Sequence, residues 1–339
     1  MCADKSLIEW TDATWNPITG CTLVDDGCRH CYAAHLITSW PAIGNHPSRK
    51  GLARKNAAGE SKFTGEVRFN EGWLDQPLHW KKPRRIFVCA HGDLFHPNVP
   101  DEWIDKVFAV MALAPQHTFQ VLTKRPERAR EYLRALECKG GYRPYISRPG
   151  WQANDPRDRD RVILLPEGQS WPLPNVWLGT SVSDQASADL RIPQLLACPA
   201  GVRFISAEPL LGPVDLTEIA APRPDLRASV MLDALNGTGG IVGTPGGKIN
   251  WVIVGGESGP HARPMNPQWA RDIRDQCIAA SVAFLFNQNC EWVSVSEVAG
   301  PGEHFKFPDG RTVRRTGKKL AGRTLDGLEW SQFPEVKHG

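Results

Sequence analysis

Three of the nine cysteines in this chain of 339 residues lie within eleven positions, at Cys21, Cys28 and Cys31. Three thiolates from one short loop are typical of a metal site. If they hold an iron–sulfur cubane, one iron keeps an open position, because the loop supplies three ligands rather than four. Zinc is the alternative, since His35 could complete a Cys3His tetrahedron. The spacing alone leaves both chemistries open.

Polar or ionisable residues directly follow several apolar segments that we predict to be strands. In a β/α barrel the carboxyl ends of the strands meet at one mouth, where catalytic groups are found. Loops at this mouth are polar in any case, so Asp93 could simply cap a turn and Glu257 could simply pair with Arg263. We nevertheless expect a shared site there, with Asp93, Lys124 and Glu208 as catalytic groups and Ser181 as a cofactor contact.

The elements that must position these residues alternate along the chain. Apolar residues at Ile104, Val107, Phe108 and Met111 predict one face of a helix that begins near Asp101. Alternation of strands and helices is the signature of parallel β/α units. We therefore predict an α/β fold, a TIM-like (β/α) barrel that is complete or partial, with a doubly wound sheet as the alternative. The eight predicted strands are 7–15, 67–69, 85–90, 119–122, 176–179, 202–205, 250–254 and 282–286.

Two segments interrupt this alternation and are predicted to be insertions in the barrel. Residues 140–171 are rich in proline and glycine and carry an alternating charge run, and residues 217–248 include a glycine-rich tip. Residues 41–63 are predicted to form a long loop. We assign the barrel to residues 1–290 and predict that the polar, turn-rich residues 291–339 form an appendage packed on it.

Composition excludes little but sets the context. The net charge is +3, from 40 basic and 37 acidic residues, which is too small to indicate nucleic-acid binding by itself. Basic runs at 49–55, 81–85 and 311–319 usually mark solvated faces. The first residues are polar and no apolar run could cross a bilayer, so we expect no membrane and a reducing cytoplasm. There, Cys89, Cys198 and Cys277 would fill the core.

The cysteine segment resembles the cluster loop of radical SAM enzymes, most closely the spore photoproduct lyase-like branch. The resemblance lies in N-P-x-x-G-C at 16–21 and G-C-x-x-C-Y-A at 27–33. Here the first two cysteines are three residues further apart, and His30 replaces a usual aromatic residue. The segments at 92–97 and 123–126 also resemble that branch. Over nearly its whole length the chain is similar to the phage Gp37/Gp68 family (DUF5131), three-cysteine proteins that resemble radical SAM enzymes.

This resemblance implies a [4Fe–4S] cluster on Cys21, Cys28 and Cys31 whose open iron chelates S-adenosyl-L-methionine. Reduction by an electron donor would yield a 5′-deoxyadenosyl radical that modifies or repairs a nucleobase or nucleic-acid substrate. The resemblance also implies cofactor contacts from Asn16 and Tyr32. Many radical SAM enzymes hold the methionine amino group with a tripeptide that here reads Gly255-Gly256-Glu257.

Two other classes of function remain open at this point. The first is a non-catalytic module, stabilised by zinc or a cluster, that works with a partner; relatives are often found beside a three-Cys-motif partner protein. The second is a nuclease- or hydrolase-like barrel with Asp93, Glu208 and Glu257 around a divalent metal.

Overall fold

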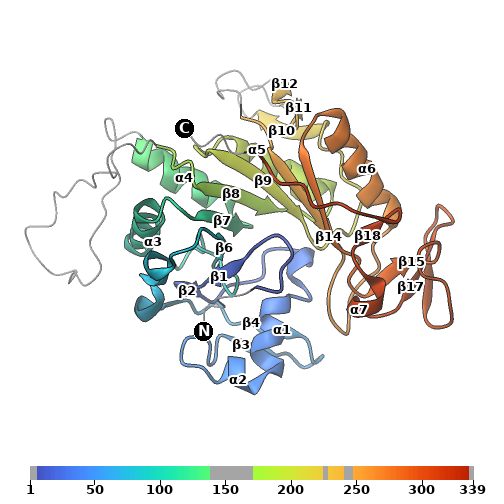
Figure 1. The fold of residues 1–339 in the computed structure, drawn as a ribbon, viewed down its shortest axis with the longest axis horizontal. Coiled ribbons are helices and arrows are strands. Elements are labelled where there is room, and N and C mark those ends of the chain that lie inside the picture. Colours follow the sequence, from blue (N-terminus) through green and yellow to red (C-terminus); the bar gives the residue numbers. More distant parts are fainter. Residues whose placement is uncertain (1–5, 138–170, 224–227, 240–246, 336–339) are drawn as a thin grey trace, which may run out of the picture.

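The computed structural model describes residues 6–137, 171–223, 228–239 and 247–335. Within them, the central sheet has seven parallel strands in the order β1-β6-β7-β8-β9-β13-β14, so that each strand lies beside its predecessor. Figure 1 shows this sheet curling from β1 to β14 with α3, α4 and α6 along its outer side. The strands are β1 (Ala13–Trp15), β6 (Arg85–Val88), β7 (Thr118–Thr123), β8 (Val176–Ser181), β9 (Val202–Ala207), β13 (Trp251–Gly255) and β14 (Ala283–Gln288).

The sheet is a half-barrel. Its order runs in one direction without the reversal that defines a doubly wound sheet, so that alternative is wrong. In the described residues, β14 does not pair with β1, and the predicted (β/α) barrel is therefore partial. No helix in this part of the chain is long and apolar enough to span a membrane.

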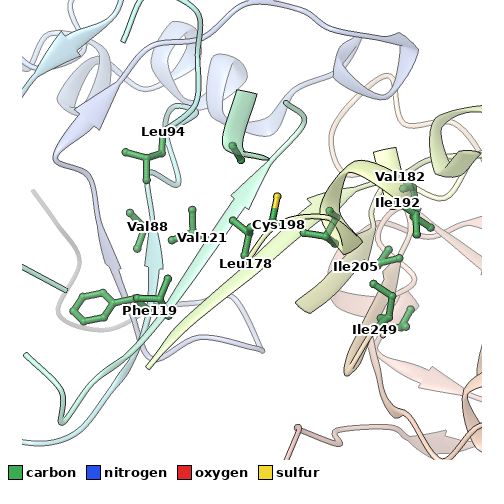
Figure 2. Close-up of a cluster of buried hydrophobic side chains, with 14 of the residues drawn as sticks. Val88, Leu94, Phe119, Val121, Leu178, Val182, Ile192, Cys198, Ile205 and Ile249 are labelled. Carbon is green, nitrogen blue, oxygen red and sulfur yellow. The ribbon is translucent and has the colours of Figure 1, made fainter. Parts of the chain in front are cut away.

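Four helices cover the outer face of the sheet. They are α3 (Asp101–Leu113), α4 (Pro126–Glu137), α5 (Gln185–Leu196) and α6 (Pro267–Ala279). The apolar face predicted for the helix near Asp101 is confirmed, since all four of its residues are buried. Figure 2 shows Val88, Val121, Leu178 and Ile205 of neighbouring strands in this outer core, together with Ile192 of α5.

The inner face of the half-barrel is filled by a second, aromatic cluster. Successive strand residues point to opposite faces, so Phe87, Trp177 and Phe204 line the inside while their neighbours Val88, Leu178 and Ile205 face the helices. The Trp251 ring lies 5.7 Å from Trp177 and 5.6 Å from Phe204. Much of the tryptophan content therefore serves packing inside the curl.

Two predictions for the first third of the chain are wrong. Residues 67–69 do not form a barrel strand; β5 (Arg68–Phe69) pairs antiparallel with β2 (Ile18–Thr19) outside the central sheet. Residues 41–63 are not a plain loop but contain α2 (Pro41–Gly44) and a hairpin of β3 (Ala53–Lys55) and β4 (Ser61–Phe63). The hairpin packs against α1 (Tyr32–Ser39). Its short polar strands lack an alternating apolar pattern, which is why the sequence predicts a loop.

Short helices and small antiparallel sheets lie outside the central sheet. Residues 217–248 contain an antiparallel sheet beside α5, whereas residues 140–170 of the other predicted insertion lie outside the described residues. The segment from Trp292 onward adds another antiparallel sheet, a short helix and a hairpin. The elements are η1 (Asp26–Cys28), η2 (Glu71–Trp73), η3 (Gln76–His79), β10 (Ile219–Arg223), β11 (Ala228–Asp233), β12 (Thr238–Gly239), β15 (Trp292–Ser294), β16 (His304–Lys306), β17 (Thr312–Arg315), α7 (Lys318–Ala321), β18 (Thr324–Leu325) and β19 (Leu328–Glu329).

Residues 330–333 cover the outer edge of β14. Phe286 N donates to Trp330 O at 3.0 Å, and Gln332 N donates to Phe284 O at 3.1 Å. The Phe333 ring then lies 5.1 Å from the Trp251 ring, and the Arg85 guanidinium lies 4.1 Å above its centroid. Because an uncovered edge strand invites pairing with other chains, this segment protects the open side of the half-barrel.

We expect Phe333→Ala to lower the free energy of unfolding by about 1–2 kcal/mol, since it removes a partly buried ring from the inner cluster. Urea denaturation of the full chain measures this. Glu335→Ala, an exposed neighbour, is the matched control and should change stability by less than about 0.5 kcal/mol. Equal stability of both variants would show that the segment does not seal the sheet.

Candidate functional site

The cysteine loop lies between β2 and α1. Gly20 begins it with φ of +101°, and a Cβ there would lie 2.0 Å from the Glu66 carbonyl oxygen, so this turn requires glycine. Cys28 ends the 3-10 helix η1, and Cys31 is the N-cap residue of α1. The loop thus presents its three sulfurs from three different local conformations.

All three cysteines line one pocket of about 150 Å³ at the carboxyl ends of β6, β7 and β8. The expected catalytic residues Asp93 and Lys124 line it as well. The pocket therefore joins groups that are far apart in the sequence, as the strand-end pattern predicts. Its wall also includes Thr22, Leu23, Val24, Tyr32, Lys62, Phe87, Cys89, Ala90, Arg125 and Ser181.

Burial favours the neutral thiol form of two of the pocket cysteines, Cys21 and Cys31. Burial raises the pKa of Cys21 to about 12; Asp93 adds to this and Arg125 opposes it. Burial also raises the pKa of Cys31, although the backbone amides of Ala34 and Ala33 act in the opposite direction. The cysteines that the structure describes are all free thiols. Since a metal needs the thiolate form, ligation here would release protons.

A partly buried cation, Arg125, lies beside the first cysteine. Arg125 Nη1 donates to Cys21 Sγ at 3.6 Å and to Asp93 Oδ2 at 2.8 Å, while Nη2 donates to Thr22 Oγ1 at 2.7 Å. The guanidinium therefore ties the cysteine loop to the end of β7. It also places positive charge where a Cys21 thiolate would form.

Asp93 positions its neighbours. Its carboxylate accepts hydrogen bonds from Phe95 N at 2.9 Å, Thr123 Oγ1 at 2.8 Å and Lys124 N at 3.3 Å, in addition to Arg125. Donors of this chain thus occupy both oxygens. These contacts are those of a carboxylate that positions the ends of β6 and β7, not those of a general base with a free oxygen.

The spacer between the first two cysteines is held by cations from three parts of the barrel. Asp25 accepts a hydrogen bond from Lys124 Nζ at 3.0 Å and pairs with Arg191 of α5, whose side chain is only 3% exposed. Asp26 pairs with Arg263. Burial by itself would raise the pKa of Asp25, but Lys124 and Arg191 together lower it to about 2.

Glu257 is already paired. Its carboxylate accepts from Arg263 Nε at 2.9 Å and Nη2 at 2.6 Å, and His30 Nδ1 lies 3.0 Å from Oε2. Burial acts to raise the pKa of Glu257, yet the bonds from Arg263 and His30 lower it overall. These are the contacts expected if Glu257 pairs with Arg263. They also link the loop after β13 to His30, which lies between Cys28 and Cys31.

The glycines before Glu257 make room for the chain itself. A Cβ on Gly255 would lie 2.3 Å from Glu208 Oε1, and one on Gly256 would lie 2.4 Å from Asn289 O. The space beside these glycines is therefore filled by the carboxylate of Glu208 and by the backbone after β14.

Glu208 and Asn16 are not among the residues that line the cysteine pocket. Glu208 accepts from Asn287 Nδ2 at 2.6 Å and Ser206 Oγ at 3.2 Å, and burial raises its pKa. Asn16 is fully buried and accepts from His91 N at 3.0 Å. Of the expected cofactor contacts, only Tyr32 and Ser181 line the pocket wall.

Among the described residues, no three His, Cys, Asp or Glu side chains converge so that they could hold one metal ion. His35, the fourth zinc ligand considered above, is not part of the pocket wall; its Nδ1 lies 3.4 Å from Ser39 Oγ. The three thiols thus share a pocket without meeting at a point.

Sequence reasoning missed the residues that anchor the loop. Asp25, Asp26 and Arg191 show no periodic pattern, and Asp26 pairs with Arg263, which is 237 positions away. The one sequence feature that could have indicated these anchors is the pair of adjacent acids, Asp25 and Asp26, between Cys21 and Cys28.

A family model described as "Protein of unknown function (DUF5131)" matches residues 5–334. The chain belongs to the DUF5131 family. This confirms the DUF5131 family, which the similarity over nearly the whole chain predicted. No curated protein and no solved structure matches the chain, so the function of this DUF5131 protein has to be argued from its site.

We expect Asp25→Asn to lower the free energy of unfolding at pH 7 by about 1–3 kcal/mol, because it leaves the buried Arg191 without a full counter-charge. Denaturant titration measures the change. Asp272→Asn, which alters an exposed carboxylate on α6, is the control and should be near neutral.

The stability difference between the wild type and Asp25→Asn should depend on pH. The folded-state pKa of Asp25 is about 2, below the roughly 3.9 of an unfolded aspartate, so its stabilisation is present above pH ~4. It is lost as the pH falls from about 4 to about 2. The stability difference between wild type and Asp25→Asn should therefore shrink over that range; a difference independent of pH would contradict the ion-pair assignment.

Proposed function

We propose that this DUF5131 protein is a radical SAM-like iron–sulfur enzyme that acts on a nucleobase or nucleic-acid substrate. In this proposal Cys21, Cys28 and Cys31 hold a [4Fe–4S] cluster, and S-adenosylmethionine binds its open iron. One observation carries the proposal: three free thiols line a single pocket at the carboxyl end of a partial β/α barrel.

The donor set fits a cluster better than a zinc ion. A tetrahedral zinc site needs every ligand within about 2.3 Å of one point. The described cysteines and His35 do not converge in this way. A cubane attaches each thiolate to a different iron, so it suits thiols spread around a pocket wall.

The surrounding charges suit a thiolate-bound cluster. Three thiolates and a cubane carry net negative charge, and Arg125 contacts Cys21 directly. Lys124 lies on the same wall, and its charge favours the Cys31 thiolate. Such neighbouring groups orient ligands and tune the group that they hold.

When bound and reduced by an external electron donor, the cluster would supply the electron that cleaves S-adenosylmethionine to methionine and a 5′-deoxyadenosyl radical. The chain's own part is to position and shield. Tyr32 donates its hydroxyl hydrogen to Ala90 O at 2.7 Å, which fixes its ring in the wall. Ser181 offers a hydroxyl to a bound cofactor, and Leu23 and Val24 add apolar surface to the wall.

The nuclease-like alternative has less support. It requires Asp93, Glu208 and Glu257 around one divalent cation, but each carboxylate is engaged by a different partner. Asp93 binds Arg125, Glu208 binds Asn287 and Glu257 binds Arg263. Their geometry does not favour a shared metal.

Anaerobic purification followed by iron, sulfide and zinc analysis tests the proposal. The wild type should contain roughly four irons and four sulfides per chain and absorb broadly near ~400 nm. Cys21→Ala, Cys28→Ala and Cys31→Ala should each lose this content, because two thiolates do not hold a stable cubane.

The matched controls are Cys198→Ala and Cys277→Ala, which remove buried thiols outside the pocket. They should keep the iron and sulfide and cost only about 1–3 kcal/mol of packing. A colourless protein with stoichiometric zinc, or one whose iron depends on Cys198 or Cys277, would refute the ligand assignment.

A further inference from the structure

The β3–β4 hairpin forms one wall of the cysteine pocket. Its residues Ser61, Lys62 and Phe63 line the pocket. The hairpin packs on α1, the helix that begins directly after Cys31, and Figure 1 shows both strands beside that helix. Strand β4 of this hairpin therefore lies beside the thiols.

The hairpin carries positive charge that its own fold does not explain. Arg54 pairs with Lys62 in the strand register, so two cations stand directly opposite on one face, an arrangement that destabilises a hairpin. Glu60 is the nearby acid, and it already contacts Arg29 at 3.1 Å and Lys62 at 3.4 Å. Within the described residues, exposed Lys50, Arg54 and Lys55 have no acidic partner.

The arginines of the other two basic runs make contacts within the fold. Arg84 lies over the Trp80 ring at 4.7 Å, and Arg85 pairs with Asp12 at 3.0 Å, at the end of β6 away from the pocket. Arg311 pairs with Asp309 and Arg315 with Glu303. Lys50, Arg54 and Lys55 lie in or just before the hairpin that lines the pocket, and among the described residues they have no acidic partner.

An apolar rim faces the same pocket. Leu23, Val24 and Tyr32 line it, and they are 55%, 39% and 43% exposed. Cations that track a backbone, together with aromatic or apolar surfaces that accept bases, are the two features of single-strand binding sites. A recessed pocket also suits a base that is free of a duplex stack.

We propose that Lys50, Arg54 and Lys55 bind phosphates of a single-stranded nucleic acid, so that one base reaches the rim formed by Leu23, Val24 and Tyr32. This deepens the proposed function and depends on it for the fate of the base. The binding itself needs no cluster.

Fluorescence anisotropy with a labelled single-stranded DNA of about 12 nucleotides, and with RNA of the same sequence, tests the surface at salt between roughly 50 and 200 mM. The full chain is compared with the triple variant K50Q/R54Q/K55Q. The variant should bind at least about tenfold more weakly. Its slope of log affinity against log salt should be smaller by about 2, since each single-strand phosphate contact contributes about 0.7.

The matched control is K81Q/K82Q/K319Q, which removes the same charge from exposed lysines of the other two basic runs. It should bind nearly as the wild type does. Equal loss in both variants, no binding by the wild type, or tighter binding of a duplex of the same sequence would each overturn the proposal. So would equally effective competition by polyglutamate, which would indicate an acidic protein partner.

Iron and sulfide measured on the same preparations separate the two proposals. A hairpin variant that keeps the cluster but loses the nucleic acid supports both. If the hairpin variant holds the cluster and still binds the nucleic acid normally, the proposed binding surface is wrong and the enzyme proposal is unaffected. If nucleic-acid binding depends on the hairpin but the chain cannot hold a cluster, the enzyme assignment is wrong and the binding surface is supported.

Discussion

The ion pairs of Asp25 hold the cysteine loop against the half-barrel. Lys124 at the end of β7 and Arg191 in α5 bind this one carboxylate, and Arg191 is almost completely buried. A buried charge that loses its partner costs several kcal/mol, so the loop can leave this position only with difficulty. Cys21 and Cys28 flank the spacer that Asp25 anchors, and their placement follows from it.

The open side of the sheet imposes a second requirement. A closed barrel satisfies all its strand edges, whereas this sheet ends at β14 and must cover that edge. Residues 330–333 do so at one side, and aromatic rings fill the curl. The carboxyl ends of β6, β7 and β8 remain accessible, which leaves space for a pocket lined by thiols.

Much of this architecture follows from short-range patterns in the sequence. The apolar face of α3 and the strand ends at Asp93, Lys124 and Ser181 could be predicted because helical periodicity and parallel strands impose regular positions. That the three cysteines lie together could be predicted from their spacing alone.

The rest depends on pairings between distant residues. Arg191 is 166 positions from Asp25, and ion pairs of this kind leave no local pattern. The β3–β4 hairpin consists of short polar strands held by packing on α1, so its sequence resembles a loop. The carboxylate of Glu257 and the glycines before it could be read as ligand contacts, and only the positions of Arg263 and Glu208 show what they touch in the chain itself.

The central claim is that the three thiols hold a cluster with one iron open to S-adenosylmethionine. Electron paramagnetic resonance of the anaerobic, chemically reduced wild-type protein, with and without S-adenosylmethionine, tests it most directly. We expect a signal from a reduced [4Fe–4S] cluster that changes when the cofactor is added, and no such signal in Cys28→Ala. A cluster signal that the cofactor leaves unchanged, or a reduced protein with no such signal, would contradict this claim.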